Sequence, residues 1–553
     1  MKPSHIRLVL CLAVLVCAVL VCEVPACYSQ SASYRKTLEQ SAKEQRIPDA
    51  QVSQSFQKYI STGKLQLSLD DAIRLALANN TDIVLDQQQI GNAKEAIDFA
   101  RGTFDPLLIS GFNVLRSTSP TFSQLSGAPT LSALSQNAQL GVSQTLLTGT
   151  NYQVSLSANK LSSNTSFNFF NPSVSGNFTF NFSQPLLRGR GFVPNRGPII
   201  IAQRGLAQSR ANFKQEVNNI ILQVVGQYWN VVQARESLGV QKKSLDEAQQ
   251  TYDHDKHSLQ LGALPPLDIY RSESQVAQRR VSEIQAEYFL KQTEDVFRQI
   301  IGADIDPNIR ALDLDLTEPP EPAGTLMNID ITTALGKALA NRPELDAQHL
   351  QLANDDLSIK IAHNALEPDL RLTGIYESNG LGGNEINVNT VPPQVISQGG
   401  WTDALSQVFG FGFPGYGIGV SLTLPIKNHA GEANLGNALV NKRRDLYSDR
   451  RIRQSITLDV TNSVHQLEES KIDMEASKVA LDLAQKNLQA EQRKYALGAQ
   501  PIFFTLEAQT ELAQAELGLV QAEVGYRLAV TAVEHATGDL LDRYNVQVTQ
   551  LSQ

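Results

Sequence analysis

The feature that most constrains this chain is one helical run of nearly sixty residues. Residues Gln203 to Gln260 contain no proline and read as a single uninterrupted helix. A helix rises about 1.5 Å per residue, so this segment alone is about 85–90 Å long. Helices of globular proteins average about eleven residues. No ordinary globular core has that depth, so side-by-side packing with other long helices is expected.

The long helix ends in a hairpin tip that the chain uses twice. Leu261-Gly262-Ala263-Leu264-Pro265-Pro266 interrupts the helix, and a second helical run follows from Leu267 to Ile300. Gly262 can take the left-handed conformation of a C-cap, and the two prolines cannot continue the helix. The same device returns 236 residues later as Leu497-Gly498-Ala499-Gln500-Pro501. This repetition indicates two helical hairpins of one design.

Other parts of the chain repeat as well, which predicts an internal duplication. At an offset of 262, the residues Ala72, Ala76, Leu77, Ala78, Asn79, Asn92, Ile97, Ala100 and Pro106 match Ala334, Ala338, Leu339, Ala340, Asn341, Asn354, Ile359, Ala362 and Pro368. At an offset of 236, matching pairs include Leu245 and Leu481, Gly262 and Gly498, and Gly302 and Gly538. We predict a signal peptide at 1–26, a polar and weakly packed N-terminal extension at 27–65, a first repeat at 66–303, a proline-rich connector at 304–328, a second repeat at 329–540 and a C-terminal tail at 541–553.

The N-terminus has the pattern of a secretory signal. A basic start precedes an apolar run from Leu8 to Val21, which is short for a membrane span, and Val24-Pro25-Ala26 favours cleavage after Ala26. All four cysteines lie at or before position 27. The mature chain therefore keeps at most Cys27, whose lipidation stays open, and forms no internal disulfide. Removal of residues 1–26 leaves 45 basic and 55 acidic residues, a charge balance that disfavours binding to nucleic acid.

Between the helices the pattern changes to a two-residue period, which is typical of strands. Val174 to Ser183 alternates apolar and polar residues without error, and Asn151 to Ala158 does the same. A third alternating stretch contains Ala138, Leu140 and Val142, and Leu107 to Arg116 is a weaker fourth. The second repeat has strands at 370–376 and 416–424, separated by a Gly/Asn-rich loop. We therefore expect four strands in the first repeat and two in the second.

These strands have the length and the two different faces of membrane strands. About nine to eleven residues carry a tilted strand across a bilayer. One face is apolar and the other is Ser, Thr, Asn or Gln, which suits a barrel with lipid outside and water inside. A soluble sandwich with one buried face is the alternative. So few strands cannot close a barrel, and an open edge is untenable in lipid. We predict a barrel shared among subunits.

In the order and spacing of its parts, the chain resembles the TolC-type outer-membrane efflux proteins. Asp105-Pro106 and Glu367-Pro368 lead into the strands, Gln184-Pro185-Leu186-Leu187 and Leu424-Pro425-Ile426 lead out of them, and Leu-Gly-Ala tips end the hairpins. The resemblance covers residues 66–540. It implies a fold that is mainly α with a membrane β-barrel portion. Duplicated hairpins of a homotrimer would form an α-helical tunnel through the periplasm, and the strands would form one shared outer-membrane β-barrel. Ordinary members contribute two strands per repeat.

The resemblance also implies a function and partners. The trimer would be the passive exit duct of a tripartite efflux or type I secretion system. It would conduct substrates from a periplasmic adaptor and an inner-membrane pump to the exterior, in contact with outer-membrane lipid and without a cofactor or nucleic acid. A structural coiled-coil envelope protein without transport activity is the alternative, which the alternating strands disfavour. A passive duct has little specificity of its own, so the cargo stays open.

Two groups of functional residues are implied by the resemblance. Leu261, Gly262 and Ala263, together with Leu497, Gly498 and Ala499, match the tips that dock the adaptor. Asp268, Tyr495 and Glu507 match positions near the periplasmic entrance, where polar links and a carboxylate ring hold the tunnel shut. Gln500 stands where the best-known members have a basic residue, and Phe504 where they have another acid. The gate would then combine a ring of Glu507 with an apolar ring of Phe504. The alternative is that Glu507 and Asp268 are solvated helix-face charges.

No constellation in the sequence predicts catalysis. His254 and His257 lie in the segment Asp253-His254-Asp255-Lys256-His257, but a metal site needs a third ligand that converges with them. Gly189-Arg190-Gly191 follows a strand, as a phosphate loop does, yet it lacks the further glycine and the lysine. A strand-to-helix corner explains those glycines. A metal hydrolase is therefore disfavoured, and we predict that the protein is not an enzyme.

Overall fold

The computed structural model describes residues 55–61, 63–121, 128–165, 168–261, 265, 267, 269–304, 306–322, 324–387, 390 and 394–548. The chain divides into two compact units. We call the one within 95–203 and 353–443 the strand unit, and the one within 47–94, 204–352 and 444–553 the helical unit. Each is described by itself below.

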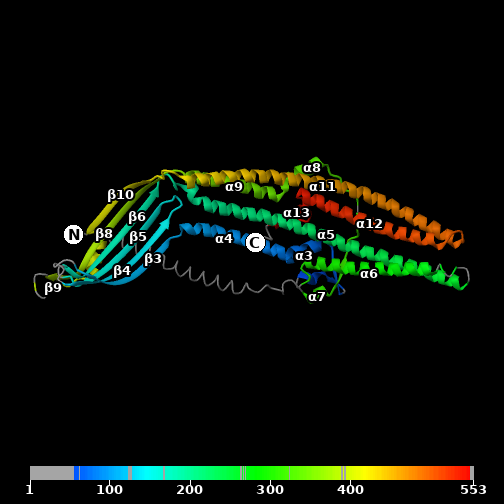
Figure 1. The fold of residues 1–553 in the computed structure, drawn as a ribbon, viewed down its shortest axis with the longest axis horizontal. Helices are drawn as coiled ribbons and strands as arrows, with labels where there is room; N and C mark the ends of the chain where they lie inside the picture. The colour runs from blue at the N-terminus through cyan, green and yellow to red at the C-terminus, as the bar shows by residue number, and fades with distance from the viewer. Residues whose placement is uncertain are drawn as a thin grey trace. The chain divides into compact units, whose positions relative to one another are not determined.

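The strand unit is built on an antiparallel sheet whose six long strands lie in the order β10-β8-β6-β5-β4-β3 (Figure 1). The first repeat contributes β3 (Leu107–Pro120), β4 (Thr130–Thr145), β5 (Asn151–Ser163) and β6 (Phe170–Pro185). The second contributes β8 (Asp369–Asn387) and β10 (Phe413–Thr423), and the short β9 (Gln394–Ser397) pairs with β8. The expected four strands in the first repeat and two long strands in the second are confirmed.

The register of the sheet places apolar side chains from all six strands on one face. One row of neighbouring Cα partners runs through Leu108, Val142, Val154, Phe180, Tyr376 and Tyr416. The adjacent row points to the opposite face, because successive side chains on a strand alternate. That row contains Ser155 and Thr179 as direct neighbours. Over β4, β5 and β6 the alternation therefore becomes one apolar and one mostly polar face, whereas β3 also has Leu107, Ile109 and Leu115 on the second face.

The region between β8 and β10 differs from the loop that the sequence indicated. The Gly/Asn-rich stretch continues β8 to Asn387, and a helix, α10 (Trp401–Phe409), precedes β10. The side chains of Ala404 and Val408 are buried. A Cβ added at Gly380 would lie 2.0 Å from the Ala404 carbonyl oxygen, and one added at Gly176 would lie 3.2 Å from Val408. Glycines that interrupt the strand pattern thus create the space that α10 occupies on the apolar face.

The helical unit contains the parts of two long hairpins. α5 (Phe192–Gln260) is followed by α6 (Ile269–Ile300), and α11 (His429–Ala496) by α12 (Ile502–Thr537) (Figure 1). Among the described residues, no helix has a stretch of 18 that is apolar enough to cross a membrane. α5 begins earlier than the expected Gln203. Pro194 lies in its first turn, where a missing N–H costs little, and Pro198 lies inside the helix.

Shorter elements complete each repeat. They are α3 (Leu69–Asn79), α4 (Thr81–Arg101), α7 (Pro307–Arg310), α8 (Ile331–Asn341), α9 (Pro343–Asn364) and α13 (Leu540–Arg543). The side chain of Ser68 accepts a hydrogen bond from the Asp71 N–H, so Ser68 is the N-cap of α3. α3 ends at Asn79, and α4 begins at Thr81.

The apolar core of the helical unit surrounds Tyr228 and Trp229 of α5, whose side chains are buried. The Tyr228 ring meets the rings of Trp229 and Phe297 edge-on, with centroids 5.5 and 6.1 Å away. The Tyr228 hydroxyl donates to the Leu67 carbonyl at 3.4 Å and accepts from the Glu318 N–H at 3.3 Å. Burial raises the pKa of Tyr228 to about 12. The core thus joins both helices of the first hairpin to segments distant in sequence.

One of these segments corrects the prediction of a weakly packed extension from residue 55 onward, whereas residues 27–54 lie outside the described part of the chain. Phe56 is 0% exposed and belongs to the core. β1 (Ile60–Ser61) pairs with β2 (Lys64–Leu67), and β2 pairs in parallel with β7 (Asp313–Leu316) of the connector. Strands of two to four residues are too short to show a periodic pattern. The close packing of residues 55–67 could therefore not be predicted from a periodic pattern in the sequence.

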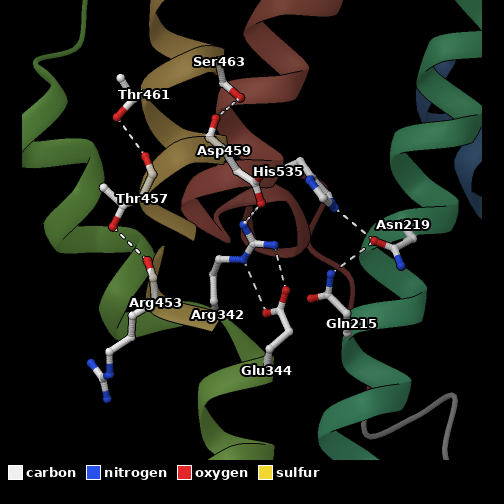
Figure 2. Close-up of polar contacts among 10 residues, drawn as sticks. All are labelled: Gln215, Asn219, Arg342, Glu344, Arg453, Thr457, Asp459, Thr461, Ser463 and His535. Carbon is white, nitrogen blue, oxygen red and sulfur yellow. Dashed lines mark hydrogen bonds and ion pairs between the residues drawn. The ribbon is translucent and has the colours of Figure 1, made fainter. Parts of the chain in front are cut away.

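A polar cluster around the buried Arg342 and the half-buried His535 ties the second repeat to α5 within the helical unit (Figure 2). Arg342 donates to Glu344 at 2.7 Å and to Asp459 of α11 at 3.4 Å. His535 Nε2 of α12 lies 3.2 Å from Asn219 Oδ1 of α5. Burial, followed by the charge of Arg342, lowers the pKa of His535. The ring is therefore neutral near pH 7, and its Nε2–H can donate to Asn219.

The two repeats end on matching glycines. Gly302 after α6 and Gly538 after α12 have φ values of +73° and +78°. A Cβ at Gly302 would lie 2.8 Å from Asn79 Cβ, and one at Gly538 would lie 3.1 Å from Asn341 Cβ. The two asparagines are themselves a matched pair of the sequence duplication. The same contact is therefore built twice.

We predict that Gly538→Ala destabilises the helical unit by about 1–2 kcal/mol, because alanine is strained at positive φ and its Cβ crowds Asn341. Thermal unfolding of the purified protein measures the effect. Gly518→Ala is the matched control, because Gly518 lies inside α12 and a Cβ there meets nothing within 4 Å. That change should be neutral or stabilising. Equal transition temperatures for the two variants would contradict the prediction.

Candidate functional site at the hairpin ends

The candidate site lies in the helical unit, where α5 and α11 end and α12 begins. Of the first tip, the structure describes Leu261, whose side chain is largely exposed. Gly262, Ala263 and Asp268, which the sequence analysis singled out, lie outside the described residues. Their assignment to the docking tip and the gate stays a prediction.

The second tip is a compact turn with an exposed apolar side chain. Gly498 has a φ of +66°, and its N–H donates to the Tyr495 carbonyl at 2.9 Å. The Ala499 N–H donates to the Lys494 carbonyl at 2.9 Å, so the turn satisfies carbonyls at the helix end. Leu497 is 83% exposed. A Cβ added at Gly498 meets nothing within 4 Å, which leaves the surface of the turn open.

The side chain of Glu491 holds the start of α12 to the end of α11. Lys494 Nζ lies 2.6 Å from Glu491 Oε1, and the Gln500 amide also donates to the Glu491 carboxylate. The hydrogen bond from Lys494, and then that from Gln500, lower the pKa of Glu491. Gln500, which replaces the basic residue of the best-known members, therefore has a local role in the turn.

A hydrogen bond links the two hairpins beside the second tip. The Tyr495 hydroxyl of α11 donates to Asp255 Oδ1 of α5 at 2.8 Å. Asp255 is 0% exposed, and among the described residues its Oδ2 has no hydrogen-bond partner. His254 Nδ1 lies 3.6 Å from Asp255 Oδ1, and the His254 ring meets the Tyr495 ring edge-on. A buried carboxylate depends strongly on its donors, so this contact is a strong link between the repeats.

A second polar contact supports the same junction. Gln509 Nε2 of α12 donates to Thr251 Oγ1 of α5 at 3.0 Å. Both residues line a groove of about 260 Å³ that also includes Tyr495, His254 and Thr505. The ends of α5, α11 and α12 are therefore joined through side chains and not through the turn alone.

Phe504 and Glu507 lie together on the exposed side of α12. The rings of Phe504 and Phe503 meet edge-on with centroids 5.4 Å apart. Phe504 and Glu507 are both exposed in the single chain. Tyr495, predicted with them as part of one gate, donates its hydrogen bond to Asp255 of α5. Whether Glu507 forms a ring or is a solvated charge depends on neighbouring subunits, so its role stays a prediction.

Asp255 is the residue of this site that sequence reasoning missed. In the sequence, Asp255 lies in the segment that contains His254 and His257, where a metal site is disfavoured. Within the described part of the chain, no group of three or more His, Cys, Asp or Glu residues could hold a metal ion. The signal that could have identified Asp255 is an acidic residue on the side of α5 that faces the second hairpin. The sequence alone does not tell which side of α5 that is.

Comparison with known proteins places this geometry in context. The family described as Outer membrane efflux protein matches residues 72–303 and 334–539. A curated relative, outer membrane efflux protein BepC of Brucella suis biovar 1 (strain 1330), is 22% identical over 363 residues, which cover 64% of this chain and 71% of BepC.

Solved structures show the same fold at low identity. A membrane protein from Pseudomonas aeruginosa superposes with a TM-score of 0.63 at 16% identity, covering 89% of this chain and 94% of that one. The Campylobacter jejuni CmeC outer membrane channel has a TM-score of 0.60 at 16% identity, with coverage of 88% and 89%. The resemblance of the fold extends over almost the whole described chain.

We predict that Tyr495→Phe loosens the hairpin ends without unfolding the helices. Loss of a hydrogen bond to a buried carboxylate costs about 1.5–3 kcal/mol, so local amide exchange near 250–260 and 490–500 should rise about tenfold or more. Tyr447→Phe, an exposed tyrosine on the same helix, is the control and should leave exchange unchanged. Equal amide exchange in the two variants would show that the Tyr495–Asp255 hydrogen bond does not stabilise the hairpin ends.

Proposed function

Because the chain belongs to the outer membrane efflux protein family, we propose that it is the passive exit duct of a tripartite efflux or type I secretion system. Three copies would share one barrel in the outer membrane and one helical tunnel in the periplasm. A periplasmic adaptor, linked to an inner-membrane pump, would bind the hairpin tips. The duct itself would perform no catalysis.

The observation that carries this proposal is a two-faced sheet with two open edges. β3 and β10 end the six-stranded path, so each pairs with a long strand on one side only. The apolar row from Leu108 to Tyr416 spans the sheet from edge to edge. Open edges are untenable in lipid, and only a closed sheet satisfies every backbone group there. Pairing of β3 in one copy with β10 in the next closes the sheet.

Exposed apolar positions on the long helices support assembly from identical copies. On α6, Val281, Ile284 and Tyr288 follow the three- and four-residue spacing of one helix face, and all three are exposed. α11 exposes Leu439, Val440, Leu446 and Tyr447. Such stripes suit side contacts between long helices of neighbouring subunits.

The hairpin ends support a gate at the periplasmic side of the tunnel. The Tyr495–Asp255 hydrogen bond holds the second hairpin to the first, so an outward movement of either hairpin end has to break it. Around a threefold axis, Glu507 would form an anionic ring and Phe504 an apolar one. Binding of the adaptor at Leu261 to Ala263 and at Leu497 to Ala499 would supply the energy that opens the junction.

The proposal is tested by the mass and the conductance of the purified protein. We expect a detergent complex of three chains that forms ion-conducting channels in planar bilayers. Val281→Asp with Ile284→Asp should shift the complex to monomers, because the charges would be buried at the helix contacts. Val281→Ile with Ile284→Val keeps the stripe apolar and should remain trimeric.

Two outcomes would overturn this proposal. A wild-type protein that is monomeric in mild detergent contradicts the shared barrel. A trimer that never conducts, even with Tyr495→Phe, would favour a structural envelope protein without transport activity.

The docking tips are tested separately. Leu261→Arg with Leu497→Arg should abolish support of efflux in cells, because the exposed apolar side chains that would contact the adaptor are replaced by charge. The trimer should still reach the outer membrane. Lys486→Glu, an exposed change on α11 away from the tip, is the control. Full efflux by the double variant would show that the adaptor binds elsewhere.

A further inference from the structure

The two repeats differ in one large respect, which is a hairpin in the strand unit. β3 and β8 both follow an acidic residue and proline, and β6 and β10 both run into proline residues, Pro185 and Pro425. β3 and β6 are therefore the counterparts of β8 and β10. β4 and β5 have no long counterpart in the second repeat. They are an insertion of two strands.

The inserted strands are full members of the sheet. β4 pairs with β3 from Ser143 to Thr130, and β5 pairs with β6 from Asn151 to Leu161. With 16 and 13 residues, β4 and β5 exceed the roughly nine to eleven residues that a tilted strand needs to cross a bilayer. Val142 and Val154 continue the apolar row of their neighbours. The insertion therefore lies in the same layer as the other strands.

The turn of the inserted hairpin is fixed to the corner between β6 and α5. The Gly191 N–H donates to the Thr148 carbonyl at 3.1 Å. Gly149 has a φ of +88°, and a Cβ there would lie 2.5 Å from the Gly189 carbonyl oxygen. Asn195 Nδ2 donates to that oxygen and to the Gly191 carbonyl, at 2.8 and 2.6 Å. Gly189 and Gly191 themselves have φ values of +78° and +82°, so the strand-to-helix corner explains why both are glycines.

We propose that this hairpin widens the outer-membrane opening, so that the duct passes bulkier cargo than the duplicated plan alone would allow. The proposal rests on the proposed trimer. Three copies of the six-stranded path make 18 strands, whereas three copies of four would make 12. Barrel diameter grows roughly linearly with strand number, so the opening is about 1.5 times wider. Barrels of 16–18 strands leave an open aqueous channel.

The wall of this opening is neutral along the inserted strands. The polar face of β4, β5 and β6 carries Ser, Asn, Gln and Thr side chains and no charged residue, as in the row Gln139, Ser157 and Asn177. α10 packs on the opposite, apolar face and leaves the polar face clear. β8 adds Arg371 and Glu377 to the same face, because Pro185 pairs with Arg371 and Thr179 with Glu377. Along the inserted strands themselves, the structure thus favours selection by size and not by charge.

The test removes the inserted strands and keeps the rest of the sheet. Deletion of residues 128–165 leaves β3 and β6 antiparallel, with Leu108 and Phe180 still on one face. Neutral polyethylene glycols of graded size are added to the external side of channels in planar bilayers, and the largest polymer that lowers conductance gives the width. The cut-off diameter of the deletion variant should be about two-thirds of that of the full chain. Equal cut-offs would overturn the inference.

Measuring the mass of the detergent complexes distinguishes a failure of this inference from a failure of the proposed function. A full chain that is not a conducting trimer contradicts the proposed function, whereas a conducting trimer whose cut-off does not respond to the deletion contradicts only the widening.

If the deletion variant does not fold, the inference is tested by labelling single cysteines in the full chain. Cys27 is replaced by serine, so that each variant has one cysteine in the mature chain. Ser155→Cys should react with a bulky membrane-impermeant maleimide added outside, and Val154→Cys should not. Equal or reversed labelling would show that β5 does not line the opening.

Discussion

Backbone hydrogen bonding is the constraint on which the rest of this structure depends. In lipid, each unpaired N–H and C=O costs several kcal/mol, so a sheet that enters a membrane has to close. This chain brings a six-stranded path whose end strands, β3 and β10, each pair with one long strand only. The family places it in the outer membrane. The proposed assembly would therefore complete the hydrogen bonds of the single chain's sheet.

The long helices are subject to a second constraint, which is the narrow width of their apolar stripes. Their apolar stripes are too narrow to build a globular core, and the buried side chains concentrate around Tyr228 and Trp229 and along the buried face of α11 near Val460. Elsewhere the helices have exposed apolar positions, such as Val281 and Ile284 of α6. Polar contacts such as that of Tyr495 with Asp255 add to the packing of the hairpin ends. Because Asp255 is buried, loss of this hydrogen bond would leave its carboxylate without that donor.

The sequence predicted the features that depend on local pattern. Proline-free helical runs, glycines at the hairpin tips and alternation located the hairpins, the duplication and all six long strands. It did not predict α10, because the glycines that accommodate Ala404 and Val408 look like a loop when their partner helix is unknown. It also missed the burial of Phe56 and the pairing of Asp255 with Tyr495. Both features depend on contacts between segments that lie more than 200 residues apart in the sequence. A local periodic pattern cannot predict such contacts.

The inserted hairpin also shows why such a sheet grows by two strands at a time. β6 leads into α5, so it has to leave the sheet at the end where the helices begin. One extra strand would reverse the direction of β6 and start α5 at the opposite end of the sheet. Two extra strands preserve that direction, and the turn at Gly149 returns to the β6–α5 corner, where Thr148 bonds to Gly191. The sheet can therefore widen by hairpins while the long helices keep their starting points.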